Sequence, residues 1–170
     1  QKSAEIGRFV SELVGSEVVS SVLVNEGGGI HVDGEGTVLL TDTVQLDPRR
    51  NPFADRARVE AEMARTIGAT KAIWLPRGLT RDYDNFGTNG HVDIVATIPS
   101  PGRLLLHDQC DAAHPDHAVT RELRELLSQQ TDAIEPRHIL VAVQTVTGIG
   151  PRRWSEQTDL LVVVQRADRQ

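Results

Sequence analysis

The chain has 170 residues, of which 39% are hydrophobic and 25% are charged, and its formal net charge is −6 at pH 7. This length and composition are typical of one globular domain with a core of ordinary size. The negative charge argues against nucleic acid as a partner, because nucleic acids select basic surfaces. No apolar run approaches the roughly 18 residues of a membrane-spanning helix, so we expect no membrane association. The single cysteine excludes an intramolecular disulfide and fits a reducing compartment, so we expect a cytoplasmic protein.

The first forty residues alternate between helical and strand patterns. Residues 4–14 place apolar side chains at helical spacing, and the Val-rich run at 18–24 predicts a buried strand. Residues 30–32 and 37–40 have β-like patterns, and the Asp-Gly-Glu-Gly sequence at 33–36 predicts a tight turn between them. The sequence therefore predicts a helix, a strand and a β-hairpin in this order.

A helix, a strand and a long loop follow. Residues 54–66 predict a helix that ends at Gly68, and residues 71–75 predict a short strand. Residues 77–89 have no periodicity and are rich in Asp, Asn and Gly, which predicts a loop of the length that often carries function. Residues 91–98 predict a return to strand.

The remaining elements repeat this order. Residues 103–107 predict a strand, residues 116–130 a helix, and residues 139–143 and 160–164 two further strands. Strand pairs that recur with a helix between them suggest a repeated ββαβ unit of about 50–60 residues. The predicted fold class is therefore α/β with small mixed sheets.

Two short motifs carry side chains suited to catalysis. Glu26 precedes Gly27–Gly29 at the end of the predicted strand 18–24, and His91 and Asp93 begin the predicted strand after the long loop. Alternate residues of a strand point to one face, so His91 and Asp93 are predicted to project together. A carboxylate accepts two parallel N–H bonds from a planar guanidinium, and an imidazole transfers protons near neutral pH. The motifs thus suit a site for a small guanidinium cation.

Each motif also has a purely structural interpretation. Glycines serve tight turns far more often than ligands, so Gly27–Gly29 fits a hairpin equally well. His91 fits a hydrogen-bonded core histidine. The residue pattern by itself leaves these alternatives open.

Four segments taken together resemble a known family. They are Asn-Glu-Gly-Gly-Gly-Ile-His-Val-Asp-Gly-Glu-Gly-Thr at 25–37, Asn-Pro at 51–52, Ile-Trp-Leu-Pro-Arg-Gly-Leu at 73–79 and Gly-His-Val-Asp at 90–93. With their spacing they resemble the agmatine deiminases, which belong to a guanidine-modifying group that includes the bacterial peptidylarginine deiminases. The resemblance covers about residues 4–135.

The resemblance implies a fold, a reaction and roles for individual residues. The implied fold is a five-bladed α/β propeller of ββαβ units, of which this chain carries two or three. The implied reaction is hydrolysis of agmatine to N-carbamoylputrescine and ammonia, a step of putrescine synthesis, without metal or cofactor. Glu26 and Asp93 are implied to hold the guanidinium, beside the backbone of Gly27 and Gly28. His91 is implied to protonate the departing ammonia and then to activate water. The resemblance leaves open whether the substrate is agmatine or a peptidyl arginine, and whether the protein is a homo-oligomer.

The sequence also departs from the family pattern. The nucleophilic cysteine of the family lies in a segment of the type Gly-Gly-Gly-Asn-Ile-His-Cys, which this sequence lacks. We therefore interpret the chain as a fragment, with a partial catalytic domain at 1–146 and a divergent tail at 147–170. We expect the 170-residue chain alone to be inactive.

Cys110 is the one thiol in the chain, and we do not predict it to be the nucleophile. Asp108 and Asp111 flank it, and nearby carboxylates disfavour the thiolate, although His107 offsets part of this effect.

Two other functions are compatible with the residues. His31-Val32-Asp33 and His91-Val92-Asp93 repeat a His-x-Asp motif, and His114 and His117 add two imidazoles, which would suit a metal-dependent hydrolase. The missing cysteine would also suit a catalytically inactive binding fragment.

Overall fold

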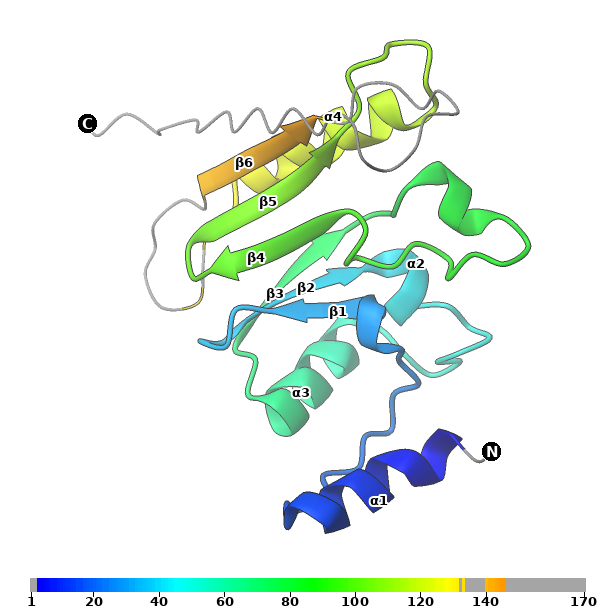
Figure 1. Ribbon diagram of the computed structural model, residues 1–170, viewed down its shortest axis with the longest axis vertical. Coiled ribbons are helices and arrows are strands. Elements are labelled where there is room, and N and C mark those ends of the chain that lie inside the picture. The colour runs from blue at the N-terminus through cyan, green and yellow to red at the C-terminus, as the bar shows by residue number, and fades with distance from the viewer. Residues whose placement is uncertain (1–2, 132, 134–139, 146–170) are drawn as a thin grey trace.

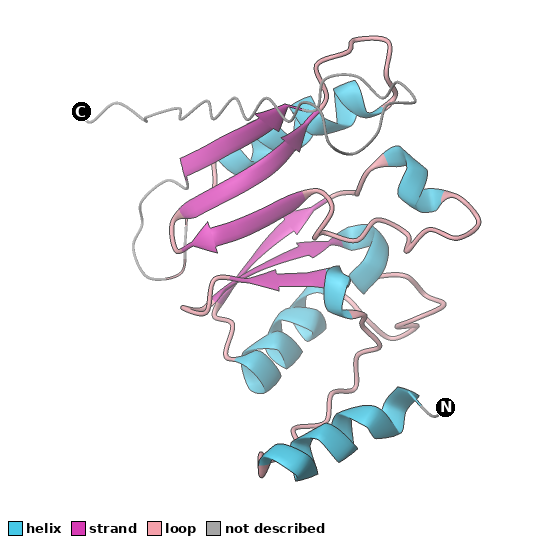
Figure 2. Ribbon diagram, viewed as in Figure 1, coloured by secondary structure: helices cyan, strands magenta, loops and turns pink. Residues whose placement is uncertain are grey.

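The computed structural model describes residues 3–131, 133 and 140–145, which form two small three-stranded sheets (Figure 1). Their elements are, in chain order, β1 (Ile30–Val32), β2 (Thr37–Thr41), α3 (Arg56–Ile67) and β3 (Lys71–Leu75), then β4 (Ala96–Ser100), β5 (Arg103–Asp108), α4 (Asp116–Ser128) and β6 (Leu140–Thr145). In each sheet the first two strands are antiparallel, and the third is parallel to the second (Figure 2). The repeated ββαβ unit and the mixed sheets predicted from the sequence are confirmed.

Local sequence explains the turn between β1 and β2. Gly34 and Gly36 have φ angles of 81° and 109°, which residues with a Cβ atom rarely adopt. The Asp33 carboxylate accepts backbone N–H bonds from Glu35 and Thr37 at 2.8 and 2.9 Å. Asp33 therefore closes the predicted hairpin turn.

The buried strand β2 lies between two hydrophobic clusters. Successive strand residues point to opposite faces. Val38 and Leu40 pack in one cluster with Val59 and Met63 of α3. Leu39 packs in the other cluster, whose members come mainly from the second unit. Leu39 thus joins the two units, and α3 covers the opposite face of the first sheet (Figure 1).

Capping residues set the bounds of α3, which the sequence predicted at 54–66. The Asp55 carboxylate accepts a bond from the N–H of Arg58 at 2.8 Å. Gly68 ends the helix in the left-handed conformation, and its N–H donates to the carbonyl of Met63. The structure also confirms α1 (Ser3–Val14) and α4, and it adds α2 (Asp42–Gln45) and the 3-10 helices η1 (Gly27–Gly29) and η2 (Thr80–Tyr83). Within the described residues, no helix is long and apolar enough to cross a bilayer.

The predicted strand at 18–24 is wrong. This segment forms no strand, and the side chains of Val18, Val19, Val22 and Val24 are exposed. Its backbone N–H groups bind side chains of the first unit instead of a neighbouring strand: Val22 donates to Glu62 and Val24 to Asn51. A run of β-branched residues favours extended backbone, but a strand also needs a pairing partner.

The predicted strand at 91–98 is correct only at its C-terminal end. β4 begins at Ala96, and the N–H groups of Val95 and Ala96 both donate to the carbonyl of Val92, which makes a turn of the preceding residues. The predicted strand at 160–164 and the tail at 147–170 lie outside the described residues.

Acidification is expected to release residues 20–22 from α3. Glu62 accepts hydrogen bonds from Arg65, the N–H of Val22 and the hydroxyl of Ser21. The Arg65 guanidinium, followed by the Val22 N–H, lowers the pKa of Glu62 from 4.5 to about 2. A lowered pKa means that the contact stabilises the folded state fully above pH 4.5 and is lost as the pH falls toward 2. Protection of the Val22 amide from hydrogen exchange, measured by NMR, should fall in this range.

The matched variants are Glu62→Gln and Glu60→Gln, on the same helix. Glu62→Gln keeps an acceptor oxygen for the Val22 N–H but does not titrate, so it should remove the fall in Val22 protection on acidification. Glu60 accepts a bond from the indole N–H of Trp74, so its replacement should leave Val22 protected. The same fall in Val22 protection on acidification in Glu62→Gln as in the unchanged chain would contradict this account.

Candidate active site

The two predicted motifs lie in equivalent loops, each leading into the first strand of a unit. Glu26 precedes η1 and β1, and His91–Asp93 precede β4. The carbonyl of Gly28 accepts bonds from the N–H groups of Val92 and Asp93 at 3.1 and 3.3 Å. Backbone contacts between the loops therefore bring residues distant in sequence into one site.

The side chains of Glu26 and His91 meet across this contact. Glu26 Oε2 lies 3.1 Å from His91 Nε2, although 65 positions separate them in sequence. The His91 side chain is 10% exposed and that of Glu26 is 46% exposed. A buried imidazole held by a carboxylate that solvent reaches suits proton transfer at the surface of a site.

Gly28 provides the space in which His91 and Asp93 come together. A Cβ atom at Gly28 would lie 2.5 Å from Asp93 Oδ2 and 2.6 Å from His91 Nδ1, whereas a Cβ at Gly27 would meet nothing within 4 Å. His91 and Asp93 thus do project to one place, but through a turn over Gly28 and not through strand alternation. Within the described part of the chain, no residue forms a hydrogen bond or ion pair with the Asp93 carboxylate, so it remains available to a cation.

The charge of Glu26 is stabilised by its neighbours. Burial by itself raises the pKa of Glu26, but the hydrogen bonds from His91 and Arg50 outweigh this effect and hold the pKa below its ordinary value of 4.5. Arg50 Nε donates to Glu26 Oε1 at 3.1 Å. Glu26 is therefore an anion at neutral pH, with each of its oxygens engaged by a different side chain.

Sequence reasoning missed Asp82, which holds the backbone of the second loop. Its Oδ2 accepts bonds from the N–H groups of Gly90 and His91 at 2.8 and 2.7 Å, and its carboxylate also binds the N–H and hydroxyl of Thr88. Burial by itself raises the pKa of Asp82, but the hydrogen bonds from Thr88 and from the backbone outweigh burial and hold the pKa below its ordinary value of 3.8. The sequence carries no local signal for this contact, because Asp82 binds backbone eight and nine residues further along the chain.

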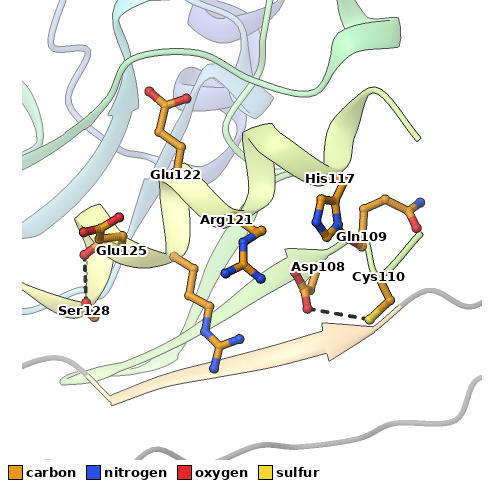
Figure 3. Close-up of a pocket in the computed structure, with 9 residues that line it drawn as sticks. Asp108, Gln109, Cys110, His117, Arg121, Glu122, Glu125 and Ser128 are labelled. Carbon is orange, nitrogen blue, oxygen red and sulfur yellow. Dashed lines mark hydrogen bonds between the residues drawn. The ribbon is translucent and has the colours of Figure 1, made fainter. Parts of the chain in front are cut away.

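Cys110 lines a different cavity. This cavity, of about 600 Å³, lies between α4 and the end of β5, and its lining includes Asp108, His117 and Arg121 but none of Glu26, His91 or Asp93 (Figure 3). Cys110 Sγ lies 3.9 Å from Asp108 Oδ2. The interpretation that Cys110 is not the nucleophile stays a prediction.

The other His-x-Asp residues have structural contacts. His31 Nε2 lies 2.8 Å from the hydroxyl of Thr97, which links β1 to β4, and Asp33 closes the hairpin turn. His117 Nδ1 lies 2.7 Å from the carbonyl of Gln109. Among the residues that the structure describes, no group of three or more His, Cys, Asp or Glu side chains is placed to hold a metal ion.

Comparison with protein families identifies the group to which this site belongs. The model of the Porphyromonas-type peptidyl-arginine deiminase family matches residues 1–162. The chain belongs to this family. The match of the peptidyl-arginine deiminase family reaches into the segment 147–170, so a domain boundary at 146 stays a prediction.

Relatives within this family share most of the chain. It is 53% identical over 147 residues to a Streptomyces coelicolor protein that carries the provisional name agmatine deiminase, covering 86% of this chain and 43% of that protein. It is 43% identical over 114 residues to the agmatine deiminase of Medicago truncatula, covering 67% of this chain and 30% of that enzyme. The chain therefore spans less than half the length of these relatives.

The chain also matches part of the solved structures of two agmatine deiminases. The agmatine deiminase of Enterococcus faecalis matches with a TM-score of 0.74 and 29% identity, over 81% of this chain and 37% of that enzyme. The C. jejuni agmatine deiminase matches with a TM-score of 0.67 and 17% identity, over 85% of this chain and 40% of that enzyme, a likeness that shows the fold alone.

Proposed function

We propose that this chain forms part of the active site of an agmatine deiminase, which hydrolyses the guanidinium of agmatine to N-carbamoylputrescine and ammonia. The observation that carries the proposal is the convergence of Glu26, His91 and Asp93 around Gly28. The names of the Medicago truncatula and Enterococcus faecalis relatives favour agmatine over a peptidyl arginine as substrate.

We assign each side chain the role that the family resemblance implies, and its geometry supports that role. The Asp93 carboxylate, which has no partner among the described residues, binds two N–H groups of the guanidinium side by side. Glu26 accepts a further N–H bond and orients the His91 ring through the contact at Nε2. His91 donates a proton to the nitrogen that leaves as ammonia, and then accepts one from the attacking water. A family-type cysteine would supply the covalent step, in which the thiolate bonds to the guanidinium carbon and water later releases the ureido product.

The proposal also includes the fold, the extent of the catalytic part and the cellular location of the protein. The two ββαβ units are two blades of a five-bladed propeller, the catalytic part extends through residue 146, and the protein acts in the cytoplasm. The likeness to the Enterococcus faecalis enzyme, which has additional chain beyond the matched 37%, supports the part of this proposal that concerns the fold.

Agmatine is expected to bind the chain at Asp93. Titration of the isotopically labelled chain with agmatine should shift the NMR signals of the Gly28 amide, the Asp93 amide and the His91 ring. Asp93→Asn removes the negative charge but keeps the shape, and it should weaken binding by at least about tenfold, since a charge-assisted hydrogen bond contributes about 1.5–3 kcal/mol.

Putrescine is the matched control ligand, because it has the carbon chain and primary amine of agmatine and a second amine in place of the guanidinium. It should cause no shift at these three positions. Equal shifts with putrescine, or unchanged agmatine affinity in Asp93→Asn, would contradict the proposed site. Ammonia release by the isolated chain that Cys110→Ala abolishes would instead assign the nucleophile to Cys110.

A further inference from the structure

The Arg50 guanidinium contacts three separate segments at once. Its Nε donates to Glu26 Oε1 at 3.1 Å, its Nη1 to Asp47 Oδ2 at 3.2 Å, and its Nη2 to the carbonyl of Thr88 at 2.8 Å. The Arg50 side chain is only 17% exposed. A guanidinium with every nitrogen engaged and little exposure has a defined position.

We propose that Arg50 is a positioning residue that fixes the Glu26 carboxylate against His91. The inference rests on the proposed function, in which Glu26 contacts the guanidinium of the substrate. Arg50 does not touch the substrate in this account and acts through Glu26.

The contacts of Arg50 connect both sides of the site. On one side it holds Glu26, and on the other it holds Thr88, three residues before His91. Thr88 is itself bound to the Asp82 carboxylate, which accepts the N–H of His91. Arg50 and Asp82 therefore fix the loop that carries His91 from two directions.

The Glu26 carboxylate is held at both oxygens. Arg50 binds Oε1 and His91 binds Oε2, so rotation of the carboxylate about its last side-chain bond would break one contact or the other. Each oxygen has a second lone pair, which leaves Glu26 able to accept from a substrate.

Asp47 offsets the positive charge of Arg50, which would otherwise repel a cationic substrate. Its buried carboxylate accepts bonds from Arg49, Arg50 and the side-chain amide of Asn89. The charged groups in contact with Glu26 are thus Arg50 and His91. Asp47 acts one contact further away through Arg50, and Asp82 acts through the backbone of His91.

The geometry requires arginine at position 50. Lysine retains the charge, but a single ammonium cannot reproduce a planar fork that reaches three acceptors in different directions. Arg50→Lys should therefore keep part of the electrostatic effect on Glu26 and lose the fixed orientation.

Titration of the Glu26 carboxyl carbon by NMR tests the proposal without substrate. Because Arg50 lowers the pKa of Glu26, Arg50→Gln should raise the titration midpoint, and Arg50→Lys should give an intermediate value. Agmatine affinity should fall roughly tenfold in Arg50→Gln, and Arg50→Lys should not restore it fully. The matched control is Arg49→Gln: Arg49 binds Asp47, is 77% exposed, and should leave the Glu26 midpoint unchanged.

A second measurement uses the unchanged Arg50. Its Nε–H signal should shift as the pH falls through the titration of Glu26, and Glu26→Gln should abolish this pH dependence. An unchanged Glu26 midpoint in folded Arg50→Gln, or an equal change in Arg49→Gln, would overturn the proposal. So would an Arg50 Nε–H signal that does not shift as Glu26 titrates. Failure of agmatine to bind the unmodified chain would contradict the proposed function and leave these readouts intact.

Discussion

Replacing Gly28 with alanine is expected to reduce agmatine affinity by about 10- to 100-fold with little loss of stability. The added Cβ would lie 2.5 Å from Asp93 Oδ2 and 2.6 Å from His91 Nδ1, far inside contact distance. Both atoms are the ends of side chains that are able to rotate away, so the backbone remains in place and the site changes shape. The displaced Asp93 carboxylate then loses a charge-assisted hydrogen bond to the guanidinium, which contributes about 1.5–3 kcal/mol and corresponds to the stated loss of affinity.

Gly27→Ala is the control for this variant. It adds the same methyl group one residue earlier, where nothing lies within 4 Å and φ is not positive. NMR titration with agmatine and thermal unfolding should be run on both variants. Equal affinities in Gly28→Ala and Gly27→Ala would show that the space over Gly28 has no role in binding.

Leu39→Ala is expected to destabilise the chain by about 2–5 kcal/mol in urea unfolding. Leu39 is fully buried in the cluster that joins the two units, where it packs with Ile73, Val95 and Leu106 among others. Truncation removes apolar contacts and leaves a cavity that the two rigid sheets cannot close.

Leu126→Ala provides the comparison, because Leu126 packs against the same cluster but is only partly buried. Its cost should be clearly smaller, since less apolar area is removed from water and solvent fills part of the space. A cost below about 1 kcal/mol for Leu39→Ala would mean that the core between the units is loosely packed.

The sequence predicted best those elements whose ends are set by their own residues. The helix predicted at 54–66 lies within about two residues of α3, because its apolar spacing and Gly68 at its end are local signals. The hairpin was predicted from the Asp-Gly-Glu-Gly sequence at 33–36, where Gly34 and Gly36 adopt positive φ angles. The strand at 18–24 was not predictable in this way, because strand formation depends on a partner that propensity does not reveal.

For the site, too, the sequence indicated the residue types but not their arrangement in space. The residue types at Glu26, His91 and Asp93 indicated guanidinium chemistry, and the family resemblance implied their roles. Their arrangement could not be derived from spacing, because it depends on the Gly28 carbonyl binding the backbone of Asp93. Arg50 gave no signal either, since a single arginine in a loop is most often a solvated surface residue.

The positions of the two site loops, one before β1 and one before β4, mean that one ββαβ unit cannot form the proposed site by itself. One ββαβ unit is preceded by Glu26, and the other by His91 and Asp93. Each unit on its own therefore has a complete sheet and helix. The first unit with its loop has Glu26 but not His91, and the second has His91 but not Glu26. The sheet and its helix are repeated in each unit, whereas the proposed site needs the loops of two neighbouring units.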